Sequence, residues 1–363
     1  MRATILNRRQ HPPAHGNKSA IGNGQPQGPA KTRAGSLAER VFRIRESGIV
    51  VVLGVFVLVT AAIQPRFLNL TNIQFVLIDT TVFALLALGE TMVVISRNVD
   101  LSIGSVLGLS AYASSNLFAV HPGINIALVF LTGMGIGLAC GVVNGTMVAV
   151  GRVPSLVVTL ATLYIIRGID ILLFSGKQVV EAELPSTFLD IPRSTIGGIP
   201  DLAIVIAAVI GAGAYYLRTY RSGRELYAIG SNPEAARLAG IPVGKRVFTA
   251  FAASGAIAGI AGVLWAAQYG TIDASAGTGY ELQVVSAVVV GGVAIFGGSG
   301  SVIGAALGAL LLATITTALY VLGISPFWDQ AIWGFLLILA IALDQTITVR
   351  LTSALRKKRT RHE

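Results

Sequence analysis

Charged and polar side chains are rare between the long apolar runs of this chain, and those present could bind a polar solute. Arg97, Asn98, Asp100 and Ser102 lie together in the stretch RNVDLS between two apolar runs. A carboxylate at bilayer depth costs on the order of 2.5–3.5 kcal/mol, so it is usually paired or faces water. One interpretation places this group on the path of a solute. The other is an Arg97–Asp100 ion pair, with Asp100 or Ser102 capping the helix that follows.

Other polar residues within the apolar runs are less strongly indicated as residues that line the path of a solute. Glu90 and Asn144 are lesser candidates, and Asn144 is expected to bond to a neighbouring helix. Arg167 and Asp170 are three residues apart, which puts them on one face of a helix and favours a structural pair.

Chemistry that needs a metal ion or a bound nucleotide is not indicated. The four histidines, at positions 11, 15, 121 and 362, are scattered. The glycines at 291–300 have no following lysine, and no G-x-x-x-x-G-K-[ST] stretch occurs, so a phosphate-binding loop is not expected. We therefore predict that the chain is not an enzyme, and that it binds no metal and no cofactor itself.

Membrane helices must position these residues. The chain is 53% hydrophobic and 12% charged, whereas a soluble domain carries about 25% charge. Continuous apolar runs of about 20 residues predict an all-α polytopic membrane protein with about ten transmembrane helices. Breaks at 96–101 and 298–300 are short enough for re-entrant or broken helices. The expected spans are 48–64, 74–95, 102–120, 124–150, 154–176, 201–219, 247–268, 282–298, 300–323 and 328–345.

The distribution of charge predicts the domains and their orientation. Residues 1–46 hold nine Lys/Arg and two acids, and residues 350–363 hold six Lys/Arg and one acid. Because basic residues beside spans stay on the cytoplasmic side, both ends are predicted to be basic cytoplasmic tails, the first one disordered. The transmembrane domain is then 47–349. The loop 218–246, with six Lys/Arg and two Glu, is also expected to be cytoplasmic.

One polar segment inside this loop predicts a short capped helix. Asn232 is a suitable cap, Pro233 suits the first helical position, and Glu234 suits the first turn. Gly240 and Pro242 end the helix, with Gly240 expected in a left-handed conformation. About two turns are too few to be stable alone. The segment is therefore either a helix that docks on a partner or a plain connecting turn.

Glu234-Ala235-Ala236-x-x-x-Gly240 resembles the "EAA" loop of ATP-binding-cassette (ABC) importer permeases. In those proteins the loop forms a short cytoplasmic coupling helix that sits in a cleft of the ATPase subunit. The resemblance implies that Glu234, Ala235, Ala236 and Gly240 couple this chain to an ATPase.

Three further stretches resemble the ribose-type sugar permeases, and they occur in the same order. They are RNVDLSIGS at 97–105, GRELYAIGSNPEAARLAGI at 223–241 and VVVGGVAIFGGSGSVIGAALGALL at 288–311. Arg97-Asn98 stands where many sugar permeases have two glycines, and this pair is closer to the autoinducer-2 permeases. The resemblance therefore leaves the particular sugar open.

The resemblance implies a permease that carries a monosaccharide or small polyol across the bacterial inner membrane by alternating access. The implied partners are an ABC ATPase subunit that uses the ATP, an extracytoplasmic solute-binding protein, and a second permease chain, identical or homologous. No nucleic acid is implied. The alternative is a secondary transporter driven by an ion gradient, with Asp100, Glu90 and Asp170 as ion ligands. The EAA-type loop argues against it, because such a loop serves no purpose without an ATPase.

Two series of glycines recur every four residues on one helix face each. Such stripes of small residues let helix backbones approach closely. We expect them to pack helices within the chain or at a dimer interface, and not to bind a ligand. The glycines are Gly133, Gly137, Gly141 and Gly145 in the first series and Gly300, Gly304 and Gly308 in the second.

Overall fold

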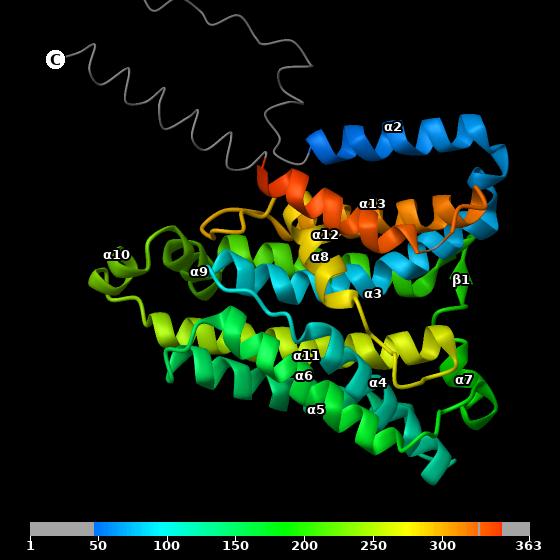
Figure 1. Ribbon diagram of the computed structural model, residues 1–363, viewed down its shortest axis with the longest axis horizontal. Helices are drawn as coiled ribbons and strands as arrows, with labels where there is room; N and C mark the ends of the chain where they lie inside the picture. The colour runs from blue at the N-terminus through cyan, green and yellow to red at the C-terminus, as the bar shows by residue number, and fades with distance from the viewer. Residues whose placement is uncertain (1–46, 326, 343–363) are drawn as a thin grey trace, which may run out of the picture. The chain divides into compact units, whose positions relative to one another are not determined.

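The computed structural model describes residues 47–325 and 327–342, and this part of the chain is almost entirely helical (Figure 1). The tails predicted at 1–46 and 350–363 lie outside the described residues. A two-stranded antiparallel sheet pairs β1 (Thr195–Ile196) with β2 (Ile199–Pro200). The helices are α2 (Ser47–Ile63), η1 (Pro65–Leu68), α3 (Leu70–Ile95), α4 (Ile103–Val120), α5 (Ile126–Ala149), α6 (Ser155–Phe174), η2 (Glu181–Glu183), α7 (Ser186–Leu189), α8 (Asp201–Thr219), α9 (Arg221–Ser231), α10 (Pro233–Leu238), α11 (Val243–Tyr269), α12 (Tyr280–Val290), α13 (Val302–Val321) and a last helix, Trp328–Ala342.

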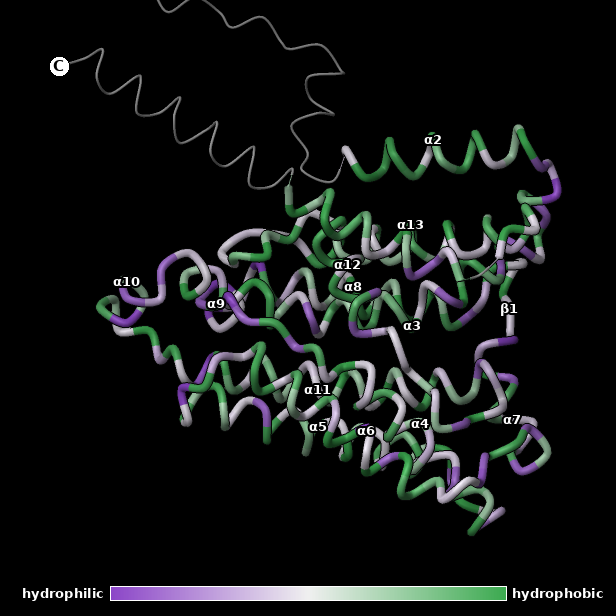
Figure 2. The backbone as a smooth tube through the Cα atoms, viewed as in Figure 1, coloured by the Kyte–Doolittle hydropathy of each residue, from purple (hydrophilic) through white to green (hydrophobic). Residues whose placement is uncertain are grey.

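Seven of the described helices are long and apolar enough to cross a membrane: α3, α4, α5, α6, α8, α11 and α13. Three shorter apolar helices, α2, α12 and the last one, coincide with the other predicted spans. Figure 2 shows apolar helices between two more polar ends. We call these the α10 end, which carries α9 and α10, and the β1 end, which carries β1 and α7 (Figure 1).

The helices form two groups that pack face to face. Figure 1 shows α2, α3, α8, α12 and α13 in one group and α4, α5, α6 and α11 in the other. The long helix α11 packs on α5 and α4 of its own group and on α3 of the other, so it joins the two. The core between them is apolar and includes Leu86, Leu107, Phe251 and Leu312, each less than 2% exposed.

A glycine stripe brings α5 and α11 into backbone contact. A Cβ at Gly137 would overlap the carbonyl oxygen of Gly255, and a Cβ at Gly141 would overlap that of Phe251. In the same way, a Cβ at Gly255 of α11 would overlap the carbonyl oxygen of Gly137 of α5. The first predicted glycine series therefore lies within the chain, and we call this contact between α5 and α11 the glycine seam.

The second glycine series lies along α13 and faces α12. A Cβ at Gly304 would overlap the carbonyl oxygen of Gly291, and a Cβ at Gly308 would overlap that of Ala287. Gly300 precedes α13, with φ +144° and Val293 directly beside it. The helix α13 therefore packs directly on the backbone of α12.

The predicted span 282–298 is shorter in the structure and is followed by irregular backbone. α12 covers 11 residues and ends at Val290. The chain then runs through Gly291–Ser301, which we call the glycine loop. Gly292, Gly297 and Gly298 all have positive φ there, a conformation that an α-helix does not allow. These glycines explain why the helix stops a turn or more before the predicted boundary.

A second interruption joins α3 to α4, and the start of α4 lies against the start of α12. Ser96–Ser102 form a turn, which we call the α3–α4 turn, and α4 begins directly after it. A Cβ at Gly104 would overlap Oε2 of Glu281, and a Cβ at Gly277 would overlap the carbonyl oxygen of Gly104. The amino-terminal ends of α4 and α12 therefore meet inside the protein.

The glycine seam predicts a large difference between two substitutions on the same helix. Gly137→Val should destabilise the protein by roughly 1–3 kcal/mol, as overpacking does. Gly135→Val should lack this cost, because a Cβ at Gly135 meets nothing within 4 Å, while the change in helix propensity is the same. The midpoint of thermal unfolding of the detergent-purified protein is the measurement. Equal midpoints for the two variants would contradict the seam.

Candidate functional site

Asp100 lies at the centre of a buried polar cluster that the α3–α4 turn builds. Its Oδ1 accepts hydrogen bonds from the backbone N–H of Ser102 at 3.0 Å and from the Ser102 hydroxyl at 2.6 Å. Its own N–H donates to Oε1 of Glu90 at 3.1 Å. Nδ2 of Asn144, on α5, donates to the Ser102 hydroxyl at 2.8 Å. All four residues are at most 2% exposed, so the cluster joins α3, α4 and α5 inside the protein.

The four residues predicted for the solute path are thus divided between the interior and the surface. Arg97 is exposed, has φ +68° and forms no ion pair with Asp100, so the predicted Arg97–Asp100 pair is wrong. The left-handed backbone at Arg97 accompanies an exposed side chain, whereas Asp100 is buried and bonded to Ser102. Asn98 donates to the carbonyl oxygen of Ser96 at 3.0 Å within the turn. Ser102 makes no side-chain cap bond to α4, and Asp100 instead binds Ser102 itself.

Two lesser candidates belong to this cluster, and each retains an unused acceptor. Asn144 bonds between helices, as predicted. Oε2 of Glu90 and Oδ1 of Asn144 are buried and have no hydrogen-bond partner among the described residues. Buried acceptors of this kind are where a protonated carboxyl, a water or a solute hydroxyl finds a partner.

The predicted pair on α6 is confirmed. Nη1 of Arg167 lies 3.8 Å from Oδ2 of Asp170, and it also donates to the carbonyl oxygen of Ala276 at 2.6 Å. Asp170 is fully buried. Gly108 of α4 faces the same carbonyl oxygen, with no room for a Cβ. The pair therefore fixes the segment before α12 against α4, close to the place where α4 and α12 meet.

At the α10 end, α10 is a short helix capped as the sequence predicts. Oδ1 of Asn232 accepts from the N–H groups of Glu234 and Ala235 at 3.1 and 3.0 Å. Gly240 has φ +78° and follows the last turn. Leu238, which the sequence reasoning did not single out, is 90% exposed. The helix α10 is therefore capped at its start and exposes one large apolar side chain near its end.

The neighbouring helix α9 is held to the start of α11 by charge. Glu225 is 6% exposed, and its carboxylate accepts from Arg246 of α11 and from Arg221 of α9. The hydrogen bond from Arg246, followed by that from Arg221, lowers the pKa of the Glu225 carboxyl below its ordinary value. The attachment is therefore present at neutral pH, and it weakens only as the pH falls through that lowered pKa.

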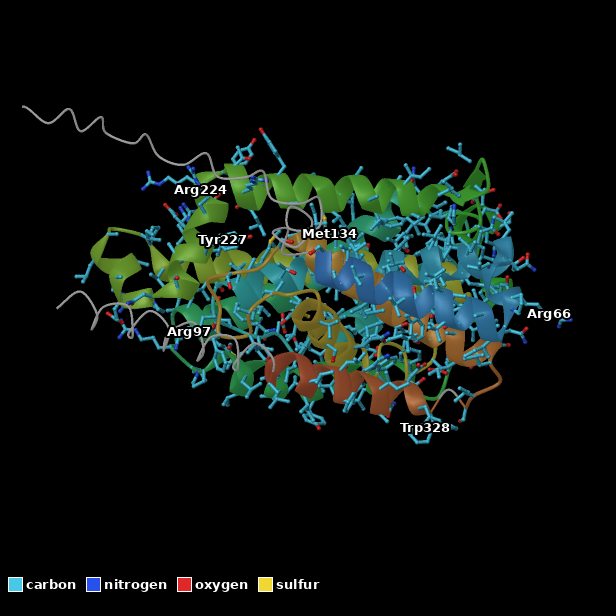
Figure 3. The ribbon with its side chains drawn as sticks, turned by 90° about the horizontal axis from the view of Figure 1, so that it is seen from above. Arg66, Arg97, Met134, Arg224, Tyr227 and Trp328 are labelled. Atoms are coloured by element: carbon cyan, nitrogen blue, oxygen red, sulfur yellow. The ribbon has the colours of Figure 1, made fainter. Side chains whose placement is uncertain are left out.

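On its other side, α9 touches both interruptions of the membrane helices. A Cβ at Gly230 would overlap the carbonyl oxygen of Ile95 and the N–H of Gly298. These two groups are hydrogen-bonded to each other at 2.9 Å. The Tyr227 hydroxyl donates to the carbonyl oxygen of Gly300 at 3.1 Å. Figure 3 shows Tyr227 at the same end of the helices as Arg97, which is part of the α3–α4 turn.

The sequence reasoning missed a group of aromatic and polar residues nearer the β1 end. Trp265, Gln268 and Tyr269 share one face of α11, and Tyr280 begins α12. Gln268 donates to Asp79 of α3. The spacing of the three α11 residues, together with an acid inside an apolar run, was the available signal. The residues that these α11 side chains contact, Asp79 and Tyr280, lie on other helices, and the sequence does not show that they are close.

Comparison with known proteins gives one family and several relatives. Residues 72–341 match the family described as "Branched-chain amino acid transport system / permease component". The chain is 34% identical over 294 residues to the autoinducer 2 import system permease protein LsrC of Enterobacter sp. (strain 638), which covers 81% of this chain and 84% of that one. It is 31% identical over 306 residues to the ribose import permease protein RbsC of Escherichia coli (strain K12), covering 83% and 94%. No solved structure matches.

The buried cluster predicts that Asp100 matters for folding and Arg97 does not. Asp100→Ala leaves the N–H and hydroxyl of Ser102 without their acceptor, at about 1–3 kcal/mol for each buried unsatisfied group. Arg97→Ala, at an exposed side chain, should leave the yield of folded protein unchanged. The yield is measured by size-exclusion chromatography of a fluorescent fusion. The charge-swapped double variant, Arg97→Asp with Asp100→Arg, should fold no better than Asp100→Arg alone, and rescue by the swap would contradict the cluster.

Proposed function

The chain belongs to the family of permease components of branched-chain amino acid transport systems, and from this premise we propose that it is the membrane-spanning subunit of an ABC importer for a small sugar. The cargo is a monosaccharide or related small polyol, as the names of the relatives that import ribose and autoinducer 2 suggest. The chain itself is not catalytic. It provides the route, and ATP is hydrolysed by a partner subunit.

The feature that carries this proposal is α10, a helix of six residues outside the membrane-spanning part. Its ends are set by Asn232 and Gly240, and Leu238 stands exposed between them. A helix this short is not stable by itself. We therefore infer that α10 keeps its helical shape because a partner protein binds it. We assign α10 as the coupling helix, with Glu234, Ala235, Ala236 and Gly240 defining its form.

The contacts of α9 provide the route from this helix into the membrane. A partner that moves α10 moves α9, which is bonded to α11 through Glu225 and Arg246. The same helix lies against Ile95 and the glycine loop through Gly230 and Tyr227. Motion of an ATPase is thereby passed to both interruptions of the membrane helices, and alternating access follows from their displacement.

The remaining parts of the assembly follow from this assignment. Two permease chains, identical or homologous, pair with two ATPase subunits on the cytoplasmic side, and a solute-binding protein delivers cargo from the other side. All ten apolar helices cross the membrane, with α12 and its flanking loops making one crossing together. The α10 end is cytoplasmic, as are both tails. The α3–α4 turn, including Asp100 and Ser102, borders the cytoplasmic half of the sugar path.

The coupling helix predicts different results for two substitutions of Gly240. A Cβ there meets nothing within 4 Å, so only the left-handed backbone restricts the residue, at roughly 1–2 kcal/mol for an ordinary side chain. Gly240→Val should distort the end of α10, whereas Gly240→Asn should be tolerated, because Asn adopts this conformation. Co-purification of the ATPase and cargo-stimulated ATP hydrolysis in proteoliposomes are measured for both.

Leu238→Asp extends this test, because the exposed side chain has no role in folding the isolated chain. We expect the Leu238→Asp variant to be purified as a folded permease that no longer co-purifies with its ATPase. If Gly240→Val and Leu238→Asp both keep the ATPase bound and hydrolysis coupled, then α10 is only a connecting turn.

The orientation predicts which of two exposed serines an external reagent reaches. Ser231 lies at the α10 end, and Ser275 lies between α11 and α12. In a Cys140→Ala background, Ser275→Cys should react with an impermeant thiol reagent added to intact cells, and Ser231→Cys should react only after the cells are opened. The reverse pattern would place the coupling helix outside and end the proposal.

A further inference from the structure

Four side chains from three helices form one connected aromatic and polar group. The indole N–H of Trp265 donates to the Tyr280 hydroxyl at 2.8 Å, and the hydroxyl oxygens of Tyr269 and Tyr280 lie 3.5 Å apart. The Tyr280 ring also stacks on Phe83 of α3, with ring centroids 4.7 Å apart. Tyr269 is 47% exposed, so the group presents an open aromatic edge with hydroxyl groups along it.

A carboxylate and an amide adjoin this edge. Asp79 lies one helical turn before Phe83, and its Oδ1 accepts from Nε2 of Gln268. Oε1 of Gln268 is buried and has no hydrogen-bond partner among the described residues. The pair therefore offers an unused amide acceptor, beside a carboxylate with further capacity to accept hydrogen bonds.

A cavity with the size of a ligand pocket opens on the side of Asp79 that faces α13; Asp79 lines it, whereas Gln268, Tyr269 and Tyr280 do not. Its volume is about 350 Å³, within the roughly 300–1,000 Å³ of small-molecule sites. The lining is mixed polar and aromatic and includes no Lys or Arg. It consists of Asn72, Phe75, Asp79, Thr316, Thr317 and Tyr320.

The position of the pair in the membrane indicates what faces it. Asp79 belongs to α3 and Gln268 to α11, both helices that are long enough to span. A half-buried carboxylate that faced lipid would cost on the order of 2.5–3.5 kcal/mol. A polar path avoids that cost, because irregular or polar surface at this depth is tolerated where it lines a cavity.

We propose that Asp79, Gln268, Tyr269 and Tyr280 form a binding site for an uncharged cyclic polyol, at the β1 end of the sugar path. The carboxylate and the free amide oxygen accept hydrogen bonds from hydroxyl groups of the sugar, and the aromatic edge covers its C–H face. With an acid and no base in the site, a phosphorylated sugar is repelled. This inference rests on the proposed function, since it assigns the cargo contacts of that same route.

The test uses the complete complex of permease, ATPase and solute-binding protein in proteoliposomes. Uptake of radiolabelled ribose and of autoinducer 2 is measured together with ATP hydrolysis stimulated by the loaded binding protein. Gln268→Ala and Asp79→Asn should each lower uptake about tenfold, the loss of one hydrogen bond to a charged or buried group. Tyr269→Ala should do the same. ATPase co-purification and stimulated hydrolysis should stay unchanged.

Tyr164→Ala is the matched control for Tyr269→Ala, because Tyr164 is 73% exposed on α6 and makes no contact with this group. Its uptake should equal that of the unsubstituted protein. Direct contact is tested with Tyr269→Cys in a Cys140→Ala background: ribose or autoinducer 2, whichever is transported, should slow modification of the thiol. This readout does not depend on the folding of the Asp79 variant.

The failures of the two proposals are distinguishable. If the unsubstituted complex moves neither probe and its hydrolysis is not stimulated, the proposed function fails. If it transports a probe while Gln268→Ala and Tyr269→Ala transport equally well, the binding site is wrong. Absence of protection at Tyr269→Cys in a transporting complex also overturns the site.

Discussion

One backbone hydrogen bond ties together the two interrupted crossings and the polar helix outside them. The N–H of Gly298 donates to the carbonyl oxygen of Ile95, and Gly230 of α9 lies against both atoms. The contact is between backbones, so side-chain rotamers cannot absorb a displacement. In a membrane environment each unpaired backbone group costs several kcal/mol. The helix α9, the end of α3 and the glycine loop are therefore in direct backbone contact with one another.

The same requirement explains why the backbone is ordered in two segments that lie between the membrane helices. In the α3–α4 turn, the carboxylate of Asp100 binds Ser102, and Glu90 accepts the N–H of Asp100. On the other side of α12 from the glycine loop, Arg167 donates to the carbonyl oxygen of Ala276. Side chains from neighbouring helices thus bind backbone groups in both of these segments. The α3–α4 turn and the segment before α12 are held in place by these polar residues.

The sequence predicted features that depend on neighbours along the chain. The positions of the spans follow from local hydropathy, and the cap at Asn232 and the left-handed Gly240 follow from local turn chemistry. The pairing of Arg167 with Asp170 follows from helical periodicity. The same local logic failed for Arg97 and Asp100, because their spacing suggests a pair only if the backbone between them is regular.

Features that depend on distant residues could not be predicted in this way. The bond between Gln268 and Asp79 joins residues 189 positions apart, and Tyr280 completes the aromatic group from a third helix. The shortened α12 reflects the fit of the glycine loop against α13 and α9. The sequence predicted a break at 298–300, but it placed the residues before that break, 291–297, inside a span.

The length of α11 has a mechanical consequence. This helix begins three residues after Gly240, and its 27 residues end at Tyr269, so it is about 40 Å long. It is a rigid rod, braced along its side by the glycine seam. With an ATPase bound at the α10 end, as proposed above, a tilt of α11 by about 10° would move its far end sideways by about 7 Å, on the helical rise of 1.5 Å per residue. A small rotation at one end of this helix would thus become a displacement of several ångströms at the other.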